Sequence, residues 1–283
     1  MKDSMIKRIA AINDFAGWSR CSLTVAIPIL TAMGFHCAPV PTAILSNHTG
    51  YDNYFFDDYT EKIDEYLSQW EKAQPPLEFA CIYTGFLGSH SQIDCVLKFT
   101  ELFKKDHTVV VVDPVMGDEG KKYPTYTKEM CEDMKKLVSV SDFATPNVTE
   151  ACILSDTEYI SEEVSDDEAQ KIALKIADLG CKNVVITGLR RKDRIINYCY
   201  ESESKRFFSV SEKESYGAYC GTGDVFASLL SGAVTKGMSF EDAVKFASEI
   251  TCIGVKESAE MGIDKLEGIA VEKLIKRICT EGA

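Results

Sequence analysis

The chain has 283 residues, enough for one large α/β domain or two small ones, and 45% of them are hydrophobic. The net charge of −13 argues against a nucleic-acid partner, and no apolar run or N-terminal pattern indicates a membrane span or a signal peptide. The eleven cysteines are scattered without zinc-ligand spacing, which favours reduced, mostly buried thiols in a cytoplasmic protein.

Strand-like and helix-like segments alternate along the chain. Short apolar or β-branched runs predict strands at Ile6–Ile12, Cys37–Leu45, Phe79–Thr84, Thr108–Val112, Asp142–Thr145 and Asn183–Thr187, and a hairpin from Ile195–Tyr200 and Arg206–Val210. Helical spacing and capping residues predict helices at Ser22–Met33, Thr60–Trp70, Ser91–Phe103, Lys128–Val138, Thr149–Leu154, Glu168–Leu179, Asp224–Thr235, Phe240–Glu257 and Val271–Cys279. This order predicts an α/β fold: one domain over residues 1–283, with a mostly parallel sheet covered by helices on both faces.

Polar residues follow several predicted strands, where ligands bind in parallel sheets. Gly221, Thr222 and Gly223 form a tight turn that delivers Asp224 to the first turn of an apolar helix. Backbone N–H groups at a helix start bind anions, and a fixed carboxylate beside them would suit phosphoryl transfer to an alcohol. The alternative is a glycine turn with an ordinary capping Asp.

Two further segments carry carboxylates after strands. Asp113 and Asp118 are suited to Mg²⁺, which prefers oxygen ligands, although Asp113 would also serve simply to end a strand. Thr145, Asn147 and Glu150 open a helix and would face phosphates or a metal-bound water, unless they only cap that helix. The polar, glycine-containing stretch 117–127 predicts a mobile loop.

Several residues in the first half of the chain are suited to bind the aromatic ring of a ligand. Asp14 would pair with a ring nitrogen or hydroxyl, and Trp18 or Phe86 would stack on the ring, although each suits a core or capping role. Asn47 and Thr49 lie in a polar loop after a strand. Cys220 is next to the helix start, which lowers a thiol pKa, so it would be more reactive than the other cysteines, unless it is simply a small residue packed under the loop.

The order of these motifs resembles the pyridoxal kinase family of the ribokinase-like superfamily. The motifs are Ser-Asn-His-Thr-Gly-Tyr at 46–51, Thr-Gly-Phe at 84–86, Asp-Pro-Val-Met-Gly-Asp at 113–118, Thr-Pro-Asn-x-x-Glu at 145–150, Val-Ile-Thr-Gly at 185–188 and Gly-Thr-Gly-Asp at 221–224. No P-loop, protein-kinase or nucleophile-elbow sequence competes with this resemblance.

The resemblance implies ATP-dependent phosphorylation of the 5′-hydroxymethyl group of pyridoxal, pyridoxamine or pyridoxine. It implies Asp224 as general base, Gly221–Gly223 as the anion hole, and Mg²⁺ at Asp118. Asp113, Thr145, Glu150 and Thr187 would line the phosphate side together with a monovalent cation such as K⁺. Asn147 and Gly188 would contact ATP, and the loop 117–126 would cover the site. Thr49 would touch the ring, and the protein would form a homodimer.

One segment departs from this family. Asp14 stands where a serine is common, 18–22 replaces a glycine-rich stretch, and Phe86 replaces a tyrosine. With an aspartate at this position, the segment resembles the hydroxymethylpyrimidine kinases of thiamin synthesis. Hydroxymethylpyrimidine therefore remains an alternative substrate. A non-catalytic B6-binding protein is a further alternative, which the intact Gly221–Asp224 turn argues against.

Overall fold

The computed structural model describes residues 6–159, 161–214 and 216–281, in which the main strands form one nine-stranded mixed sheet. In chain order these strands are β1 (Arg8–Trp18), β2 (His36–Asn47), β3 (Phe56–Asp58), β4 (Cys81–Thr84), β5 (Val109–Val112), β8 (Phe143–Ala144), β9 (Asn183–Arg191), β10 (Arg194–Glu201) and β11 (Arg206–Lys213). Their spatial order is β11-β10-β9-β8-β5-β4-β1-β2-β3. The six strands from β9 to β2 are parallel, whereas β3, β10 and β11 at the two edges pair antiparallel.

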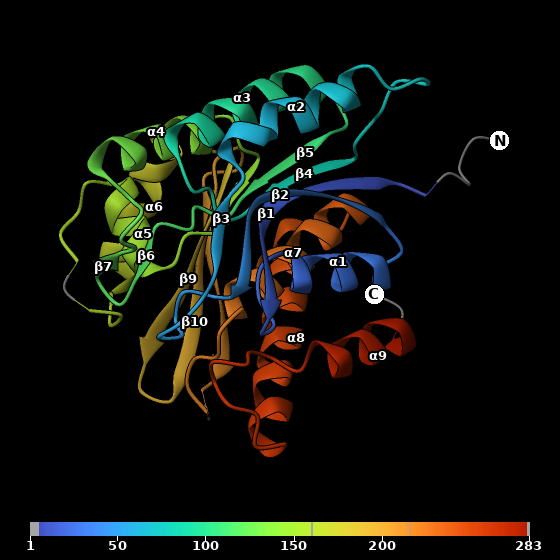
Figure 1. Cartoon of the computed structure of the whole chain (residues 1–283). Coiled ribbons are helices and arrows are strands. Elements are labelled where there is room, and N and C mark those ends of the chain that lie inside the picture. The colour runs from blue at the N-terminus through green and yellow to red at the C-terminus, as the bar shows by residue number, and fades with distance from the viewer. Residues whose placement is uncertain (1–5, 160, 215, 282–283) are drawn as a thin grey trace.

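Helices cover both faces of this sheet (Figure 1). One face carries α2 (Thr60–Glu71), α3 (His90–Phe103), α4 (Lys128–Ser139), α5 (Val148–Leu154) and α6 (Asp166–Asp178). The other face carries α1 (Leu23–Ala32), α7 (Thr222–Lys236), α8 (Phe240–Glu260) and α9 (Val271–Glu281). The predicted mostly parallel sheet with helices on both sides is therefore confirmed.

The sheet separates two hydrophobic cores because neighbouring residues of a strand face opposite sides. In β5, Val110 and Val112 join the core under α2–α6, while Val111 between them joins the core under α1 and α7–α9. Such strands are buried on both faces and read as continuous apolar runs, which is why 108–112 is easily predicted.

Four local expectations need correction. The first strand continues to Trp18, with a register shift against β2 between Asn13 and Phe15, so Asp14 lies at a bulge inside a strand and not in a loop. The strand β9 passes through Gly188 and ends at Arg191. The short edge strand β3 was not predicted. The segment 117–127 contains a small hairpin of β6 (Gly117–Asp118) and β7 (Lys121–Lys122), where the sequence predicts a loop.

No helix among the described residues is both long enough and apolar enough to cross a membrane.

Candidate active site

The turn before α7 has a conformation that requires glycine. Gly221 is the N-cap of the helix with φ of 74°, and a Cβ at this position would lie only 2.1 Å from the carbonyl oxygen of Arg20. The hydroxyl and the backbone N–H of Thr222 both donate hydrogen bonds to the carbonyl of Tyr219. Within the described residues, the N–H groups of Gly223 and Asp224 have no protein acceptor. The turn therefore offers an anion-binding helix start, in which Gly223 and Asp224 supply the available donors.

Asp224 is held at both carboxylate oxygens. Oδ1 accepts a hydrogen bond from Nδ2 of Asn13 at 3.0 Å, and Oδ2 accepts one from the backbone N–H of Ser22 at 2.8 Å. Burial raises the pKa of Asp224 to about 8, helped by the nearby Asp113 and Asp14 carboxylates, although the Ser22 and Asn13 hydrogen bonds oppose this shift. A carboxylate with such a pKa is suited to accept a proton near neutral pH.

Asn13 is among the polar residues that follow the predicted strands, but the sequence analysis gave it no role in the site. Its side chain is fully buried, and its Oδ1 accepts hydrogen bonds from the N–H groups of Phe86 and Asp14 while Nδ2 reaches Asp224. A Cβ on Gly85 would lie 2.3 Å from this amide, so the glycine after β4 leaves the room that Asn13 occupies. Its position before Asp14 and after an apolar run is the only signal in the sequence, and that signal does not link it to Asp224.

Asp113 faces the same turn from the end of β5. The Thr145 hydroxyl donates to its Oδ1 at 3.1 Å, and its Oδ2 lies 3.9 Å from where a Cβ on Gly223 would stand. Burial raises the pKa of Asp113 to about 7. Asp113 and Thr145 follow the carboxyl ends of β5 and β8, and these parallel strands bring them to the start of α7, as the sequence predicts.

The start of α5 uses Asn147 and Glu150 as a capping box. The Asn147 side chain accepts from the Glu150 N–H, and the Glu150 carboxylate accepts from the N–H groups of Asn147 and Met116. Nδ2 of Asn147 also donates to the Gly117 carbonyl at 2.8 Å. Asn147 and Glu150 therefore do cap α5, which is the structural alternative that the sequence left open. Burial, followed by repulsion from Asp113, still raises the Glu150 pKa well above its usual range.

Asp118 lies on the β6–β7 hairpin, which is attached to α5. Besides the Asn147 contact, the Gly120 N–H donates to the Thr149 hydroxyl at 2.8 Å. The Asp118 side chain is exposed, its Oδ1 accepts from the Glu119 N–H, and partial burial of the carboxylate raises its pKa. Its charge also raises the pKa of Glu150, so the two carboxylates are near each other.

Thr187 and Gly188 lie beside this group, because Thr187 pairs with Asn147 across an isolated parallel bridge. Gly188 has φ of 78°, and a Cβ added there would meet no atom within 4 Å. The surface above it is therefore open to a ligand.

The residues expected around a ring lie in β1, after β4, and at or beyond the end of β2. Asp14 is 7% exposed, and burial raises its pKa to about 6. The Phe86 ring is half-buried against Tyr126. The Asn47 amide donates to the Asn53 carbonyl, and Thr49 is exposed beyond the end of β2.

The Cys220 pKa is lowered to about 5, but mainly for a different reason than its position at a helix start. The Cys21 thiol has the largest effect, and burial opposes the shift. His48 and then the Gly221 N–H at the helix start contribute the rest of the lowering.

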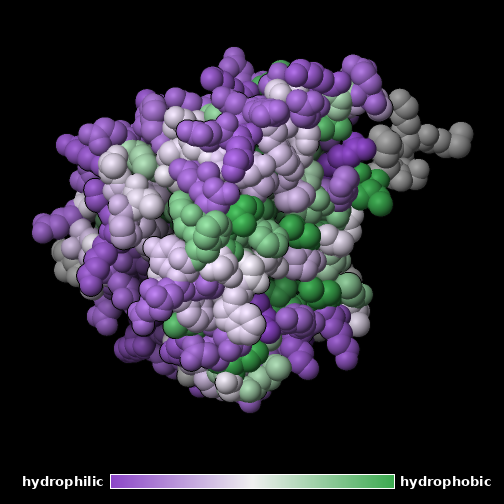
Figure 2. All heavy atoms as spheres, viewed as in Figure 1, coloured by the Kyte–Doolittle hydropathy of each residue, from purple (hydrophilic) through white to green (hydrophobic). Residues whose placement is uncertain are grey.

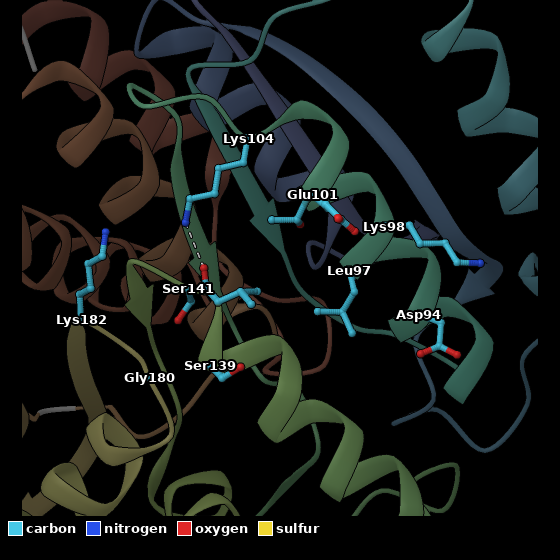
Figure 3. Close-up of a pocket in the computed structure, with 11 residues that line it drawn as sticks. Asp94, Leu97, Lys98, Glu101, Lys104, Ser139, Ser141, Gly180 and Lys182 are labelled. Carbon is cyan, nitrogen blue, oxygen red and sulfur yellow. Dashed lines mark hydrogen bonds between the residues drawn. The ribbon is translucent and has the colours of Figure 1, made fainter.

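A shallow hollow of about 790 Å³ lies away from these residues, between the end of α3, the segment before β8, and the Gly180 turn. Figure 3 shows Lys104 reaching across it, where its ammonium group donates to the Val140 carbonyl. None of the carboxylates described above lines this hollow.

A divalent cation would find oxygen donors but no complete cage. No three His, Cys, Asp or Glu side chains of the described segments converge as metal ligands. Asp113, Asp118 and Glu150 have raised pKa values, and no Lys or Arg within the described residues forms a salt bridge with them, although Arg190 is near enough to Asp118 to oppose the rise. This set fits a hard cation that takes its other oxygens from phosphate and water.

The family model described as phosphomethylpyrimidine kinase matches residues 27–268. A protein of Bacteroides thetaiotaomicron, assigned provisionally as a phosphomethylpyrimidine kinase and crystallised with pyridoxal, is 35% identical with a TM-score of 0.92, over 97% of this chain and 96% of that one. Pyridoxal kinase from Lactobacillus plantarum is 27% identical with a TM-score of 0.88, over 97% of both chains. The pyridoxine/pyridoxal/pyridoxamine kinase of Bordetella avium is 27% identical over 89% of this chain and 88% of its own length.

Proposed function

The chain belongs to the phosphomethylpyrimidine kinase family, and from that premise we propose that it transfers the γ-phosphoryl group of ATP to the 5′-hydroxymethyl group of vitamin B6 vitamers. The observation that carries this proposal is the Asp224 carboxylate. It is fixed by Asn13 and Ser22, has a pKa of about 8, and lies beside the available N–H groups of the α7 start. The pyridoxal bound to the Bacteroides relative supports a pyridine substrate.

In this mechanism Asp224 accepts the proton of the substrate hydroxyl. The alcohol oxygen then bonds to the γ-phosphorus as the bond to the β-phosphate oxygen breaks, and ADP leaves. The donors at Gly221–Gly223, with the N–H of Gly223 as the available one, would stabilise charge on the transferred group. The β6–β7 hairpin, attached through Asn147 and Thr149, would cover the phosphates and exclude water.

Asp118 and Asp113 would hold Mg²⁺, which when bound neutralises phosphate charge. Thr145 and Glu150 would complete the phosphate side together with a monovalent cation such as K⁺. The raised pKa values of these carboxyls support both assignments, because a nearby cation would favour their ionised forms. The open surface at Gly188, with Thr187 and Asn147, would receive ATP.

The ring would lie between Asp14, Phe86 and Cys220, with Thr49 and Asn47 at its outer side. Asp14 would contact the ring nitrogen or hydroxyl, and the Cys220 thiolate would face the pyridoxal aldehyde. Because Asp14 also suits a pyrimidine, hydroxymethylpyrimidine is the second candidate substrate, and the family description supports it.

A phosphorylation assay with ATP and Mg²⁺ over pyridoxal, pyridoxamine, pyridoxine and hydroxymethylpyrimidine tests the proposal. We expect kcat/KM to be highest for a pyridine. A higher value for hydroxymethylpyrimidine would transfer the assignment to the second candidate. Failure to consume ATP with every alcohol would leave only a non-catalytic binding role.

We further propose a homodimer of single-domain subunits. Figure 2 shows a hydrophobic surface over the region of β1, β2 and β3. Large exposed side chains in these strands and their connection include Phe15 at 38%, Trp18 at 60% and Phe55 at 63%. A contiguous apolar surface of this kind is typical of a subunit interface. The eleven free cysteines support a reducing compartment such as the cytoplasm.

A further inference from the structure

Two cysteines meet at the catalytic turn although they lie far apart in the sequence. Cys21 lies just before α1 and is 5% exposed, whereas Cys220 lies just before α7 and is half-buried. Cys220 packs against the small apolar cluster that contains Cys21, Ala16 and Leu45. The two thiols influence each other, because Cys220 raises the pKa of Cys21 and Cys21 lowers the pKa of Cys220.

The backbones of the two segments are also in direct contact. A Cβ on Gly221 would lie 3.2 Å from the Cα of Cys21, and one on Gly268 would lie 2.6 Å from the Arg20 carbonyl and 3.0 Å from the Cys220 carbonyl. The Cys220 N–H donates to the Lys265 carbonyl, and the Arg20 N–H donates to the Glu267 carbonyl. The segment 265–268 thus holds the two cysteine-bearing segments against each other, and forming a disulfide of about 2.05 Å would draw them closer together.

The surroundings distinguish the two sulfurs. His48, whose Nε2–H donates to the Leu266 carbonyl, lies beside Cys220 and favours its thiolate. Cys21 is the opposite case, because its own pKa is raised far above the usual range. One partner is therefore a nucleophile at neutral pH, and the other is a protonated thiol in contact with it.

We propose that Cys21 and Cys220 form a reversible disulfide when a peroxide reaches the catalytic turn, and that this bond switches the enzyme off. The Cys220 thiolate attacks one peroxide oxygen, the O–O bond breaks, and Cys220 becomes a sulfenic acid while the hydroxide that leaves takes up a proton from solvent to give the first water. The Cys21 sulfur then attacks the Cys220 sulfur. The S–O bond breaks, the S–S bond forms, and the Cys21 proton leaves with the second water, so two thiols are oxidised and one peroxide is reduced.

The bond would act on Asp224 through its neighbours. Ser22, which donates to the Asp224 carboxylate, directly follows Cys21, and the N-cap Gly221 directly follows Cys220. Drawing 21 and 220 together moves both supports of the catalytic turn. A displacement of about 1 Å in a catalytic group can reduce turnover about a hundredfold. This consequence rests on the proposed kinase function, whereas the disulfide does not.

The test treats the full-length protein with limiting hydrogen peroxide and follows peptide masses under non-reducing conditions together with turnover. We expect a linked peptide pair containing Cys21 and Cys220, a loss of turnover of at least about tenfold, and recovery with dithiothreitol. Because mass mapping needs no turnover, it separates failure of this proposal from failure of the kinase assignment.

Two variants sharpen the test. In Cys21→Ser, the Cys220 sulfenic acid has no resolving thiol, so we expect labelling of Cys220 by dimedone and no linked peptide. The double variant Cys252→Ser/Cys279→Ser removes two more accessible thiols and should respond as the wild type does. Absence of the 21–220 linkage in the wild type, or full turnover of the linked form, would overturn the proposal.

Discussion

The two ends of the parallel sheet both carry shielded aspartates, but their partners differ. At the amino end, Asp142 lies just before β8 and pairs with Lys182 at 2.7 Å and Lys104 at 3.4 Å, while its Oδ2 accepts from the Val110 N–H. At the carboxyl end, Asp113 and Asp224 accept only from hydroxyl, amide and backbone groups. No lysine or arginine pairs with either of them in the part of the chain that the structure describes.

This difference separates structural from functional carboxylates. A carboxylate that is already paired with lysines of the protein, as Asp142 is, is less available to bind a ligand. The Asp113 and Asp224 carboxylates are buried without a cationic partner. Burial of their charged forms is unfavourable and raises their pKa values, so a role in folding does not explain why they are aspartates. A bound cation would provide Asp113 with the missing positive partner, and the substrate hydroxyl would provide Asp224 with a proton.

The largest effect is expected at the proposed base. Asp224→Asn keeps the shape of the side chain but removes the proton acceptor, so turnover should fall by roughly two to four orders of magnitude. Steady-state kinetics with saturating ATP and Mg²⁺ measures this loss. Turnover within tenfold of the wild type would remove Asp224 from the role of general base.

The same residue sets the pH profile. Its raised pKa of about 8 means that the active, ionised form is the minor one at pH 7 in the free enzyme. We therefore expect kcat/KM of the wild type to increase with pH and to level off above about pH 8. A profile that is already flat from pH 6 would contradict the raised pKa.

Asn13 connects the base to the sheet, and its loss should have the next largest effect. Asn13→Ala removes the Nδ2 donor to Asp224 and leaves two buried N–H groups without their acceptor. We expect turnover to fall about tenfold to a hundredfold, with lower stability. Asn183→Ala at the amino end, which loses one hydrogen bond to the Asp142 carbonyl, is the matched control and should leave turnover unchanged.

Asn13 also illustrates what the sequence could not reveal. Its position after an apolar run predicts only the end of a strand, whereas the structure continues β1 to Trp18 and places Asn13 under Asp224. The residues are 211 positions apart. The pairing of β1 with β2 and β4 places Asn13, and the packing of α7 against α1, β4 and β5 places Asp224 next to it.

Other parts follow directly from local patterns. The helix predicted at Glu168–Leu179 is present as α6, which begins with a capping box of Ser165 and Glu168, and the predicted hairpin is present as the antiparallel pair of β10 and β11. Asp113 and Thr145 could be placed at one edge because both follow parallel strands. The Cys220 environment could not be, since Cys21 and His48 reach it from two other segments.

The unpaired charge of Asp113 should be visible in stability. In an Asp whose folded pKa of about 7 exceeds its unfolded value, stability falls as pH rises between the two values, because the unfolded chain releases the proton first. Asp113→Asn, which does not titrate, should therefore raise the Tm at pH 8 by a few degrees relative to the wild type, with little difference near pH 4. Differential scanning calorimetry without Mg²⁺ measures this, and an unchanged or lower Tm at pH 8 would argue against a buried charge there.

The smallest effect is expected at Asp142, and in the opposite direction. Asp142→Ala removes two lysine contacts, which are worth little at a partly exposed position, and leaves the Val110 N–H without its side-chain acceptor. The free energy of unfolding should fall by about 1–2 kcal/mol, with turnover unchanged. Denaturant unfolding and the same kinetic assay measure the two quantities. If Asp142→Ala lowered turnover as Asn13→Ala does, the two ends of the sheet would not be functionally separate. Loss of stability with full turnover would show that Asp142 supports the fold and is not needed for the reaction.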